Sequence, residues 1–425
     1  MNKFKRYLPE GVTDILFEDC RRKTNIEMKL RKFYKKSGYH ELISPTFEFY
    51  DVFQGRFNSY SQETMFKFFD NLGRILVLRP DMTTPIARIA GTKLENFKLP
   101  LKLCYNGNIY KTNESWNGKI SEITQSGIEV IGVGSKKSDI EVLITAINAL
   151  IAIDIKDFEI EIGEVNFLIG ILEDTKLDED KKVELKLNIE NKNFAAIKNF
   201  ARDNIDCIGE DISYLLKEIP KMYGGLEILD KARSMIKNKK SLKALDDIED
   251  IYKVIEDIGL ASYISIDLGM IQEINYYTGI IFKGYTKEVG SEILSGGRYD
   301  NLVSDFGRDL KAIGFGINVD SIVQALDKKQ GKYLDEIIRV VILDKGYYKE
   351  AYKLSGKIKD IGLISEISLF DEENHNENAD YLIEFEKNDL CKLTDLKRNE
   401  YKIINIEDII IDLEDIYEAY KNSIN

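Results

Sequence analysis

The chain has 425 residues, 44% of them hydrophobic and 31% charged, so it is long enough to bury a core in two or more domains. Its net charge of −13 argues weakly against a nucleic-acid partner, because a local basic patch can coexist with an acidic total. The longest apolar run, residues 142–153, is too short to cross a bilayer, and the first residues lack the apolar stretch of a signal peptide. We therefore expect a cytoplasmic protein.

Cysteine and histidine are too sparse to build the commonest metal and nucleophile sites. The four cysteines lie far apart and form no Cys-x-x-Cys pair, which indicates reduced thiols without a disulfide framework or zinc knuckle. The two histidines, His40 and His375, argue against a histidine-based metal site and against a Ser–His triad. We therefore expect neither a metal ion nor another cofactor.

The first part of the chain combines a helix with short strands. Residues 17–37 predict a helix that ends at Gly38, a residue typical of helix C-termini. The following strand-like run contains Pro45, which favours a sheet edge or a bulge. Residues 63–79 predict a hairpin, and residues 85–92 continue from it into a short helix.

Residues 102–132 predict two strands joined by a polar loop. Gln125, Gly127 and Glu129 share one face of the second strand, because strand side chains repeat every second residue. A glycine between two hydrogen-bonding side chains leaves room for a ligand against the sheet, and the carboxylate suits a cationic or N–H-bearing group. A surface-facing amphipathic hairpin has the same alternation, so this stretch alone leaves both interpretations open.

Beyond this hairpin the pattern becomes helical and then returns to strands. Residues 139–153 predict an amphipathic helix, and residues 158–165 predict a strand. Residues from about 167 to 258 are mostly helical, with charged faces typical of solvated surfaces. Strands return in residues 261–285, and residues 312–326 predict a strand that leads into a helix.

A glycine pair and a charge imbalance mark the last third of the chain. Gly296–Gly297 permits a tight backbone approach in a turn, where we favour a structural ion pair of Arg298 and Asp300 over a ligand-binding role. Residues 331–425 contain 13 basic and 22 acidic residues, a net charge of −9. The alternation of strand and helix in this tail predicts a βαβ unit in a small α/β domain.

Several stretches in the same order carry a family resemblance. The run 102–132 resembles motif 2 of class II aminoacyl-tRNA synthetases, and most of all that of histidyl-tRNA synthetase. LRPDMTTPIAR at 78–88 resembles the amino-acid-binding segment of that family, and NYYTGIIF at 275–282 resembles its second histidine-binding signature. The forms LRPDMT and SGGRYDNL are more similar to a paralogous family, the regulatory subunits of ATP phosphoribosyltransferase.

The resemblance implies an α+β fold, with the antiparallel sheet of class II synthetases flanked by helices. Residues 1–327 would form this synthetase-like domain, with a helical insertion at about 167–258 that separates motifs 2 and 3. The segment around Pro45 resembles motif 1, which builds the dimer interface in the family. Residues 332–425 resemble a diverged anticodon-binding domain.

The resemblance also assigns a histidine pocket. Asp81, Thr83 and Gln125 would hold the α-ammonium group of histidine by hydrogen bonds. Glu129 and Tyr276 would hold the imidazole, and Tyr277 would add an aromatic wall. Asp81 is one methylene shorter than the glutamate usual in the synthetases, which puts the shape of the pocket in doubt.

The positions that handle phosphate in the synthetases are altered. Forming an aminoacyl-adenylate needs cations aimed at the α-phosphate, and arginine suits this through its bidentate fork. The arginine positions of the family are matched here by Lys111, Lys119, Ser121, Gln272 and Ser321. We therefore expect aminoacylation activity to be lost. The histidine position that follows the motif 2 loop carries Thr124.

A site that binds histidine but does not activate it fits a sensor. In the family this subunit pairs with the short-form catalytic subunit of ATP phosphoribosyltransferase, which carries out the first step of histidine biosynthesis. The resemblance thus implies a non-catalytic regulatory subunit, a homodimer within a hetero-oligomer, with histidine as effector and no nucleic-acid or membrane partner. Two alternatives are a divergent histidyl-tRNA synthetase and a stand-alone histidine-binding module.

Overall fold

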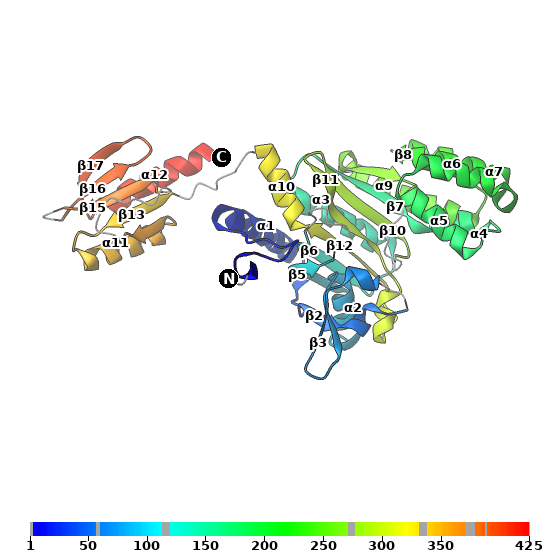
Figure 1. Ribbon diagram of the computed structural model, residues 1–425. Helices are drawn as coiled ribbons and strands as arrows, with labels where there is room; N and C mark the ends of the chain where they lie inside the picture. The colour runs from blue at the N-terminus through cyan, green and yellow to red at the C-terminus, as the bar shows by residue number, and fades with distance from the viewer. Residues whose placement is uncertain are drawn as a thin grey trace. The chain divides into compact units, whose positions relative to one another are not determined.

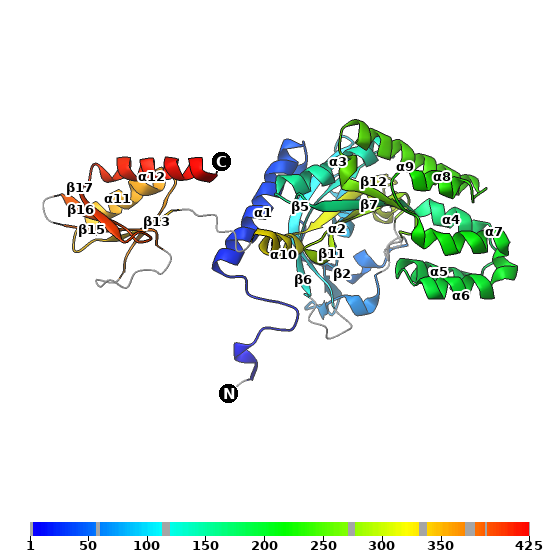
Figure 2. The same ribbon diagram turned by 90° about the horizontal axis from the view of Figure 1, so that it is seen from above.

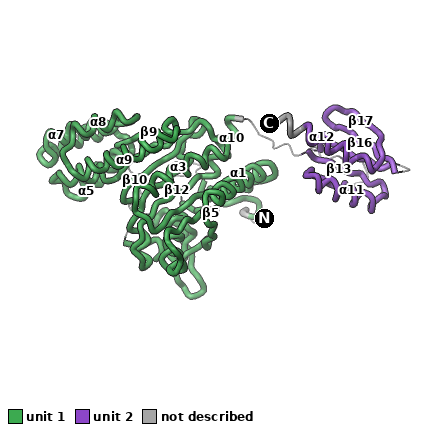
Figure 3. Tube along the Cα trace, turned by 180° about the vertical axis from the view of Figure 1, so that it is seen from behind, with its two compact units in different colours: residues 1–333 green, residues 334–425 purple. Residues whose placement is uncertain are grey.

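The computed structural model describes residues 3–56, 60–112, 120–270, 277–330, 338–369, 379–386 and 389–424 (Figure 1). The chain divides into two compact units, Met1–Tyr333 and Leu334–Asn425 (Figure 3). None of the helices in these ranges is long and apolar enough to cross a membrane. In the same ranges, no group of three or more His, Cys, Asp or Glu side chains is arranged to hold a metal ion.

A mixed sheet forms the centre of the first unit, with nine strands among the described residues. In spatial order the strands are β1 (His40–Glu41), β5 (Leu101–Tyr110), β6 (Glu122–Ile131), β12 (Ala312–Asn318), β11 (Val289–Arg298), β10 (Ile280–Thr286), β7 (Phe158–Glu164), β9 (Ile264–Asp267) and β8 (Tyr223–Gly224). All neighbours are antiparallel except β1 with β5 and β7 with β9. The long β5–β6 hairpin confirms the two strands predicted around the polar loop.

Helices cover the two faces of this sheet unequally. The helices α1 (Phe17–Lys36), α3 (Lys136–Ala152) and α10 (Val319–Gln330) lie along one face (Figure 2). Their buried side chains, such as Leu30 of α1 and Ile147 of α3, join the largest apolar core. On the other face, α2 (Thr83–Thr92) and the 3-10 turn Leu302–Phe306 pack against part of the sheet, and residues of other segments, such as Tyr60 and Glu190, border the space beside them.

A small three-stranded sheet lies between β1 and β5 of the central sheet in chain order. It consists of β2 (Phe47–Phe49), β3 (Lys67–Phe69) and β4 (Ile75–Leu78), in the order β2-β4-β3. The β3–β4 pair confirms the predicted hairpin in residues 63–79, and α1 and α2 confirm the two predicted helices. Pro45 lies between β1 and β2, outside both strands.

The predicted helical insertion is present. Its helices are α4 (Val165–Glu173), α5 (Glu179–Glu190), α6 (Phe194–Asp203), α7 (Ile205–Glu218), α8 (Glu227–Arg233) and α9 (Lys239–Asp257). Short polar side chains start several of them: Asp178 accepts a hydrogen bond from the Lys181 amide at 2.8 Å, and Asn238 accepts one from the Lys240 amide at 2.8 Å. Such caps satisfy amide groups that have no partner inside the helix.

The second unit is a five-stranded sheet with two described helices. Its strands are β13 (Arg339–Leu343), β14 (Ile364–Ile367), β15 (Tyr381–Phe385), β16 (Leu390–Asp395) and β17 (Glu400–Asn405), and its helices are α11 (Tyr348–Asp360) and α12 (Ile409–Ile424). The parallel pairing of β13 with β14 around α11 confirms the predicted βαβ unit. The sequence patterns gave no prediction for β16, β17 or α12.

Candidate functional site

A cavity of about 630 Å³ opens on the face of the central sheet that carries α2. Its wall includes side chains from β6, β11 and β12, from the start of α2 and from the loop before β10. The predicted residues Asp81, Thr83, Gln125 and Tyr277 all line it. Glu129 lies at its edge, buried, with its carboxylate against Gly314 of the cavity wall. Tyr276 lies outside the described residues.

Glycines create the space for this cavity, though not at the position that the sequence pattern indicated. A Cβ atom on Gly314 would lie 1.7 Å from Glu129 Oε2, and one on Gly316 would lie 2.3 Å from Gln125 Nε2. Both glycines therefore allow a neighbouring polar side chain to lie flat on the sheet. The prediction that Gly127 leaves space for a ligand is wrong. The Tyr105 hydroxyl lies 2.6 Å from the position that a Cβ atom on Gly127 would take, so this side chain fills the space.

Glu129 is held by two hydroxyl donors and is 1% exposed. Thr83 Oγ1 donates to Oε1 at 2.9 Å, and the Tyr299 hydroxyl donates to Oε2 at 2.5 Å. Burial raises the pKa of Glu129 to about 8, and the negative charge of Asp81 adds to the shift, while the two hydrogen bonds oppose it. A buried carboxyl group that is predominantly protonated at neutral pH therefore borders the cavity.

Asp81 has a structural role as well as a place in the cavity wall. Its Oδ1 accepts a hydrogen bond from the Thr84 amide at 2.6 Å, and its Oδ2 accepts one from Thr84 Oγ1 at 2.9 Å, at the start of α2. Burial raises the pKa of Asp81, and its hydrogen bonds oppose the shift. The shorter side chain relative to the synthetase glutamate is thus compatible with helix capping at this position.

Tyr299 is a site residue that the sequence analysis missed. The segment around Gly296–Gly297 was expected to form a turn, but both glycines lie inside β11. Because side chains alternate along a strand, Gly297 and Tyr299 face the cavity while Arg298 points to the opposite side. Tyr105 also lines the cavity and was not predicted as a site residue. It lies opposite Gly127 in the β5–β6 pair, and this pairing depends on the register of the two strands.

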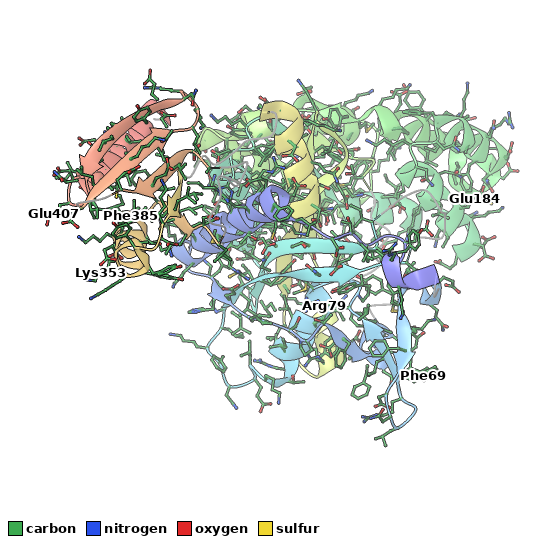
Figure 4. All side chains as sticks on the ribbon, turned by 60° about the vertical axis from the view of Figure 1, so that its left-hand side comes forward. Phe69, Arg79, Glu184, Lys353, Phe385 and Glu407 are labelled. Atoms are coloured by element: carbon green, nitrogen blue, oxygen red, sulfur yellow. The ribbon has the colours of Figure 1, made fainter. Side chains whose placement is uncertain are left out.

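Arg298 confirms the predicted structural ion pair, since its Nη1 lies 3.0 Å from Asp300 Oδ1. The same guanidinium also bonds Asp139. Arg79 is likewise structural: it is 5% exposed, and it donates to the carbonyl oxygens of Asn108 at 2.7 Å and Ser44 at 2.8 Å (Figure 4). Its Nε and Nη1 groups thus join β5, through Asn108, to the segment between β1 and β2, through Ser44.

The altered phosphate positions are only partly within the described residues. Lys111 lines the cavity, together with Lys283, whose Nζ lies 3.7 Å from Glu292 Oε2. The described cavity wall contains these two lysines and no arginine. Ser321 lies at the start of α10, where its amide donates to Asn318 Oδ1 at 3.0 Å. Lys119 and Gln272 lie outside the described residues.

The polar groups next to Ser321 and at Thr124 form hydrogen bonds and an ion pair within the protein. Asp320 Oδ2 accepts a hydrogen bond from the Thr124 amide at 2.7 Å, and its Oδ1 pairs with Lys23 Nζ at 2.7 Å. Thr124 Oγ1 donates to Asn108 Oδ1 at 2.8 Å. This end of the sheet is therefore joined to α1 and α10 by a polar network.

Comparisons with known proteins agree with this fold. A family model of histidyl-tRNA synthetase matches residues 11–322. An ATP phosphoribosyltransferase regulatory subunit of Clostridium botulinum (strain Langeland) is 48% identical over 416 residues, which cover 96% of this chain and 99% of that protein. One of Clostridium acetobutylicum is 50% identical over 385 residues, with 90% and 94% covered.

Solved structures give the same result at the level of the fold. The structure of an ATP phosphoribosyltransferase regulatory subunit/histidyl-tRNA synthetase from Bacillus halodurans C matches with a TM-score of 0.78 and 30% identity, covering 86% of this chain and 93% of that one. A histidyl-tRNA synthetase from Nostoc sp. PCC 7120 matches with a TM-score of 0.81 at 18% identity, covering 97% of this chain and 99% of that one, and so shares the fold.

The fold and the sheet-borne cavity thus define a class II synthetase-like protein of the histidyl-tRNA synthetase type. Within this class, the two Clostridium relatives, which are 48% and 50% identical to this chain over most of its length, are both named ATP phosphoribosyltransferase regulatory subunit. The chain belongs to the family of ATP phosphoribosyltransferase regulatory subunits.

Proposed function

We propose that this protein is a non-catalytic regulatory subunit of ATP phosphoribosyltransferase that acts in the first step of histidine biosynthesis and senses histidine in the cavity described above. The observation that carries the proposal is the pair of buried carboxyl groups, Asp81 and Glu129, at a cavity whose described wall lacks arginine. Such a cavity favours a ligand that brings ammonium and N–H groups, and it disfavours a triphosphate.

Glu129 suits an imidazole for a specific reason. Its two oxygens are oriented by Thr83 and Tyr299, and burial raises its pKa to about 8, above the ordinary imidazole value of about 6.5. One proton can therefore be shared between the carboxyl group and the bound ring without a net charge in the buried site. An apolar analogue of the same size would leave the carboxyl group unpaired, which gives polar discrimination.

The partner that we propose is the short-form catalytic subunit of ATP phosphoribosyltransferase, the enzyme named in the relatives. We further propose that two copies of the chain associate through the small sheet and the segment before it. Ile43, Phe47, Phe49 and Phe69 expose large apolar side chains there, between 43% and 85% accessible, and a second copy would cover them. Figure 4 labels Phe69. Loss of aminoacylation and a cytoplasmic location are parts of the same proposal.

The test is a pair of titrations on the complex with the short catalytic subunit, one with wild-type protein and one with Glu129→Ala. Calorimetry follows histidine binding, and turnover follows inhibition. We expect histidine to inhibit the wild-type complex, and we expect the variant complex to need a higher histidine concentration for the same inhibition. Equal inhibition of the two complexes would place the sensing site elsewhere, because a ligand shifts an assembly only by its differential affinity for two states.

A further inference from the structure

A second, smaller cavity of about 280 Å³ lies behind the first one, on the opposite side of the β10–β11 wall. Its residues come from α3, from the junction of β7 and α4, from α9 and from the start of β10. One part of the wall is apolar, formed by Ile248, Ile251 and Ile280, which are all buried. We call it the rear cavity.

Most charges around the rear cavity are neutralised inside the protein. Arg298 pairs with Asp139 and Asp300 and also donates to Ser138 Oγ at 2.9 Å. Lys136 Nζ lies 2.8 Å from Asp247 Oδ1 and also pairs with Asp250. These groups form a rigid wall, because their charges are matched by fixed partners within the fold.

Glu164 is the exception. It is 8% exposed and lines the rear cavity, yet no lysine or arginine of the described residues forms an ion pair with it. Within the described part of the chain its hydrogen-bond donors come from one residue: the Asn166 amide at 3.0 Å and Asn166 Nδ2 at 2.7 Å. Burial raises the pKa of Glu164 to about 7; the hydrogen bonds from Asn166 oppose the shift, the charge of Asp247 adds to it and the charge of Lys240 opposes it.

Lys243 has the complementary character. It lines the same cavity from α9, it is exposed, and within the described part of the chain its ammonium group makes no ion pair or hydrogen bond. The rear cavity thus combines a buried anion without a cation, an apolar wall, and a cation without an anion. A molecule with the reverse arrangement, a cation and an anion joined by a short apolar body, would satisfy both ends at once.

We propose that the rear cavity is a second ligand site, which binds a small zwitterion of amino-acid size. Its ammonium group lies against the Glu164 carboxylate, its hydrocarbon part lies along Ile248 and Ile251, and its carboxylate lies toward Lys243. The ammonium charge stabilises the ionised form of Glu164, and the ligand gains a charge-assisted hydrogen bond with a buried carboxylate.

The two cavities share a wall. Tyr277, Gly297 and Tyr299 face the first cavity, whereas Thr278 and Arg298 face the rear cavity. The Thr278 carbonyl accepts a hydrogen bond from Asn166 Nδ2 at 3.0 Å, so the group that holds Glu164 is bonded directly to this wall. We therefore expect occupancy of the rear cavity to change the affinity of the first cavity for histidine, an expectation that rests on the proposed function.

The test uses the full chain, two zwitterionic probes (5-aminopentanoate and 6-aminohexanoate) and two half-probes (pentylamine and pentanoate). Binding is followed by saturation-transfer NMR in the absence of histidine. We expect at least one zwitterion to bind saturably, and we expect Glu164→Gln to weaken it by about tenfold or more. Lys243→Ala should weaken the zwitterion but not pentylamine. Lys239→Ala removes an exposed lysine of the same helix outside the cavity and should change neither.

Glu164 also caps α4, so circular dichroism and histidine binding are used to check that the Glu164→Gln variant is folded. Lys243→Ala tests the proposal independently, because Lys243 is exposed and its replacement does not disturb the core. The proposal is overturned if neither zwitterion binds saturably up to about 10 mM, a concentration that detects even millimolar affinity. It is also overturned if binding is the same in the Glu164 and Lys243 variants as in the wild type. If the bound probe leaves the affinity for histidine unchanged, the expected coupling between the two cavities is refuted, and the proposal of a ligand site in the rear cavity still stands.

Discussion

Replacing Glu129 by glutamine should stabilise the empty protein, and the gain should depend on pH in a defined direction. The folded pKa of about 8 lies above the ordinary value of 4.5, so between these values the folded state binds a proton that the unfolded state has released. Stability contributed by the protonated carboxyl is therefore complete below about pH 4.5 and is lost as the pH rises toward 8. At about 1.4 kcal/mol per pH unit, the loss at pH 7 is on the order of 3 kcal/mol.

Glutamine removes this titration and keeps the size of the side chain. Its amide can still accept a hydrogen bond, and the hydroxyl groups of Thr83 and Tyr299 can rotate to act as donor or acceptor. The difference in unfolding free energy between Glu129→Gln and the wild type should be small near pH 5 and should favour the variant by on the order of 3 kcal/mol near pH 7. Other buried carboxyls, such as Glu164, titrate equally in both proteins and cancel in the difference.

The measurement is urea unfolding followed by circular dichroism at a series of pH values without histidine. Glu184→Gln, at an exposed carboxylate of α5, is the matched control and should show no such pH-dependent difference (Figure 4). A stability difference for Glu129→Gln that is the same at every pH would refute the reasoning, because it would mean that Glu129 is ionised throughout the range.

Three further predictions concern ligands and can be checked with standard assays. We expect no histidine-dependent ATP–pyrophosphate exchange, since the cavity wall lacks arginine in its described part; exchange at rates ordinary for a synthetase would contradict this. We expect no specific binding of histidine tRNA, because residues 331–425 carry a net charge of −9; a salt-sensitive gel shift at sub-micromolar protein would count against it. We expect Glu129→Ala to weaken histidine binding by about 1–3 kcal/mol in calorimetry, and an unchanged dissociation constant would remove Glu129 from the binding site.

The sequence was sufficient for the β3–β4 and β5–β6 hairpins and for the common strand face of Gln125 and Glu129, because these features depend on local sequence patterns. Gln125 and Glu129 alternate along one strand, so their common face follows from backbone geometry alone. The contact of Thr83 with Glu129 joins residues 46 positions apart, and Tyr299 reaches the same carboxylate from 170 positions away. Such contacts depend on strand order and register, which hydrophobic periodicity does not specify. Glycine in β11 was misread for the same reason, because its neighbour across the sheet decides whether it marks a turn or a close approach.

The cost of Glu129 to the fold is itself an argument for a ligand. A buried carboxyl with a pKa of about 8 destabilises the empty protein at neutral pH relative to a neutral side chain of equal size. Proteins are rarely at their stability optimum, but a cost of this size at a cavity wall is typical of functional sites. A site without a ligand would gain stability by replacing Glu129 with a neutral side chain. The structure instead keeps the carboxyl group oriented by two hydroxyl donors, an arrangement that the proposed recognition of an N–H-bearing amino acid would use.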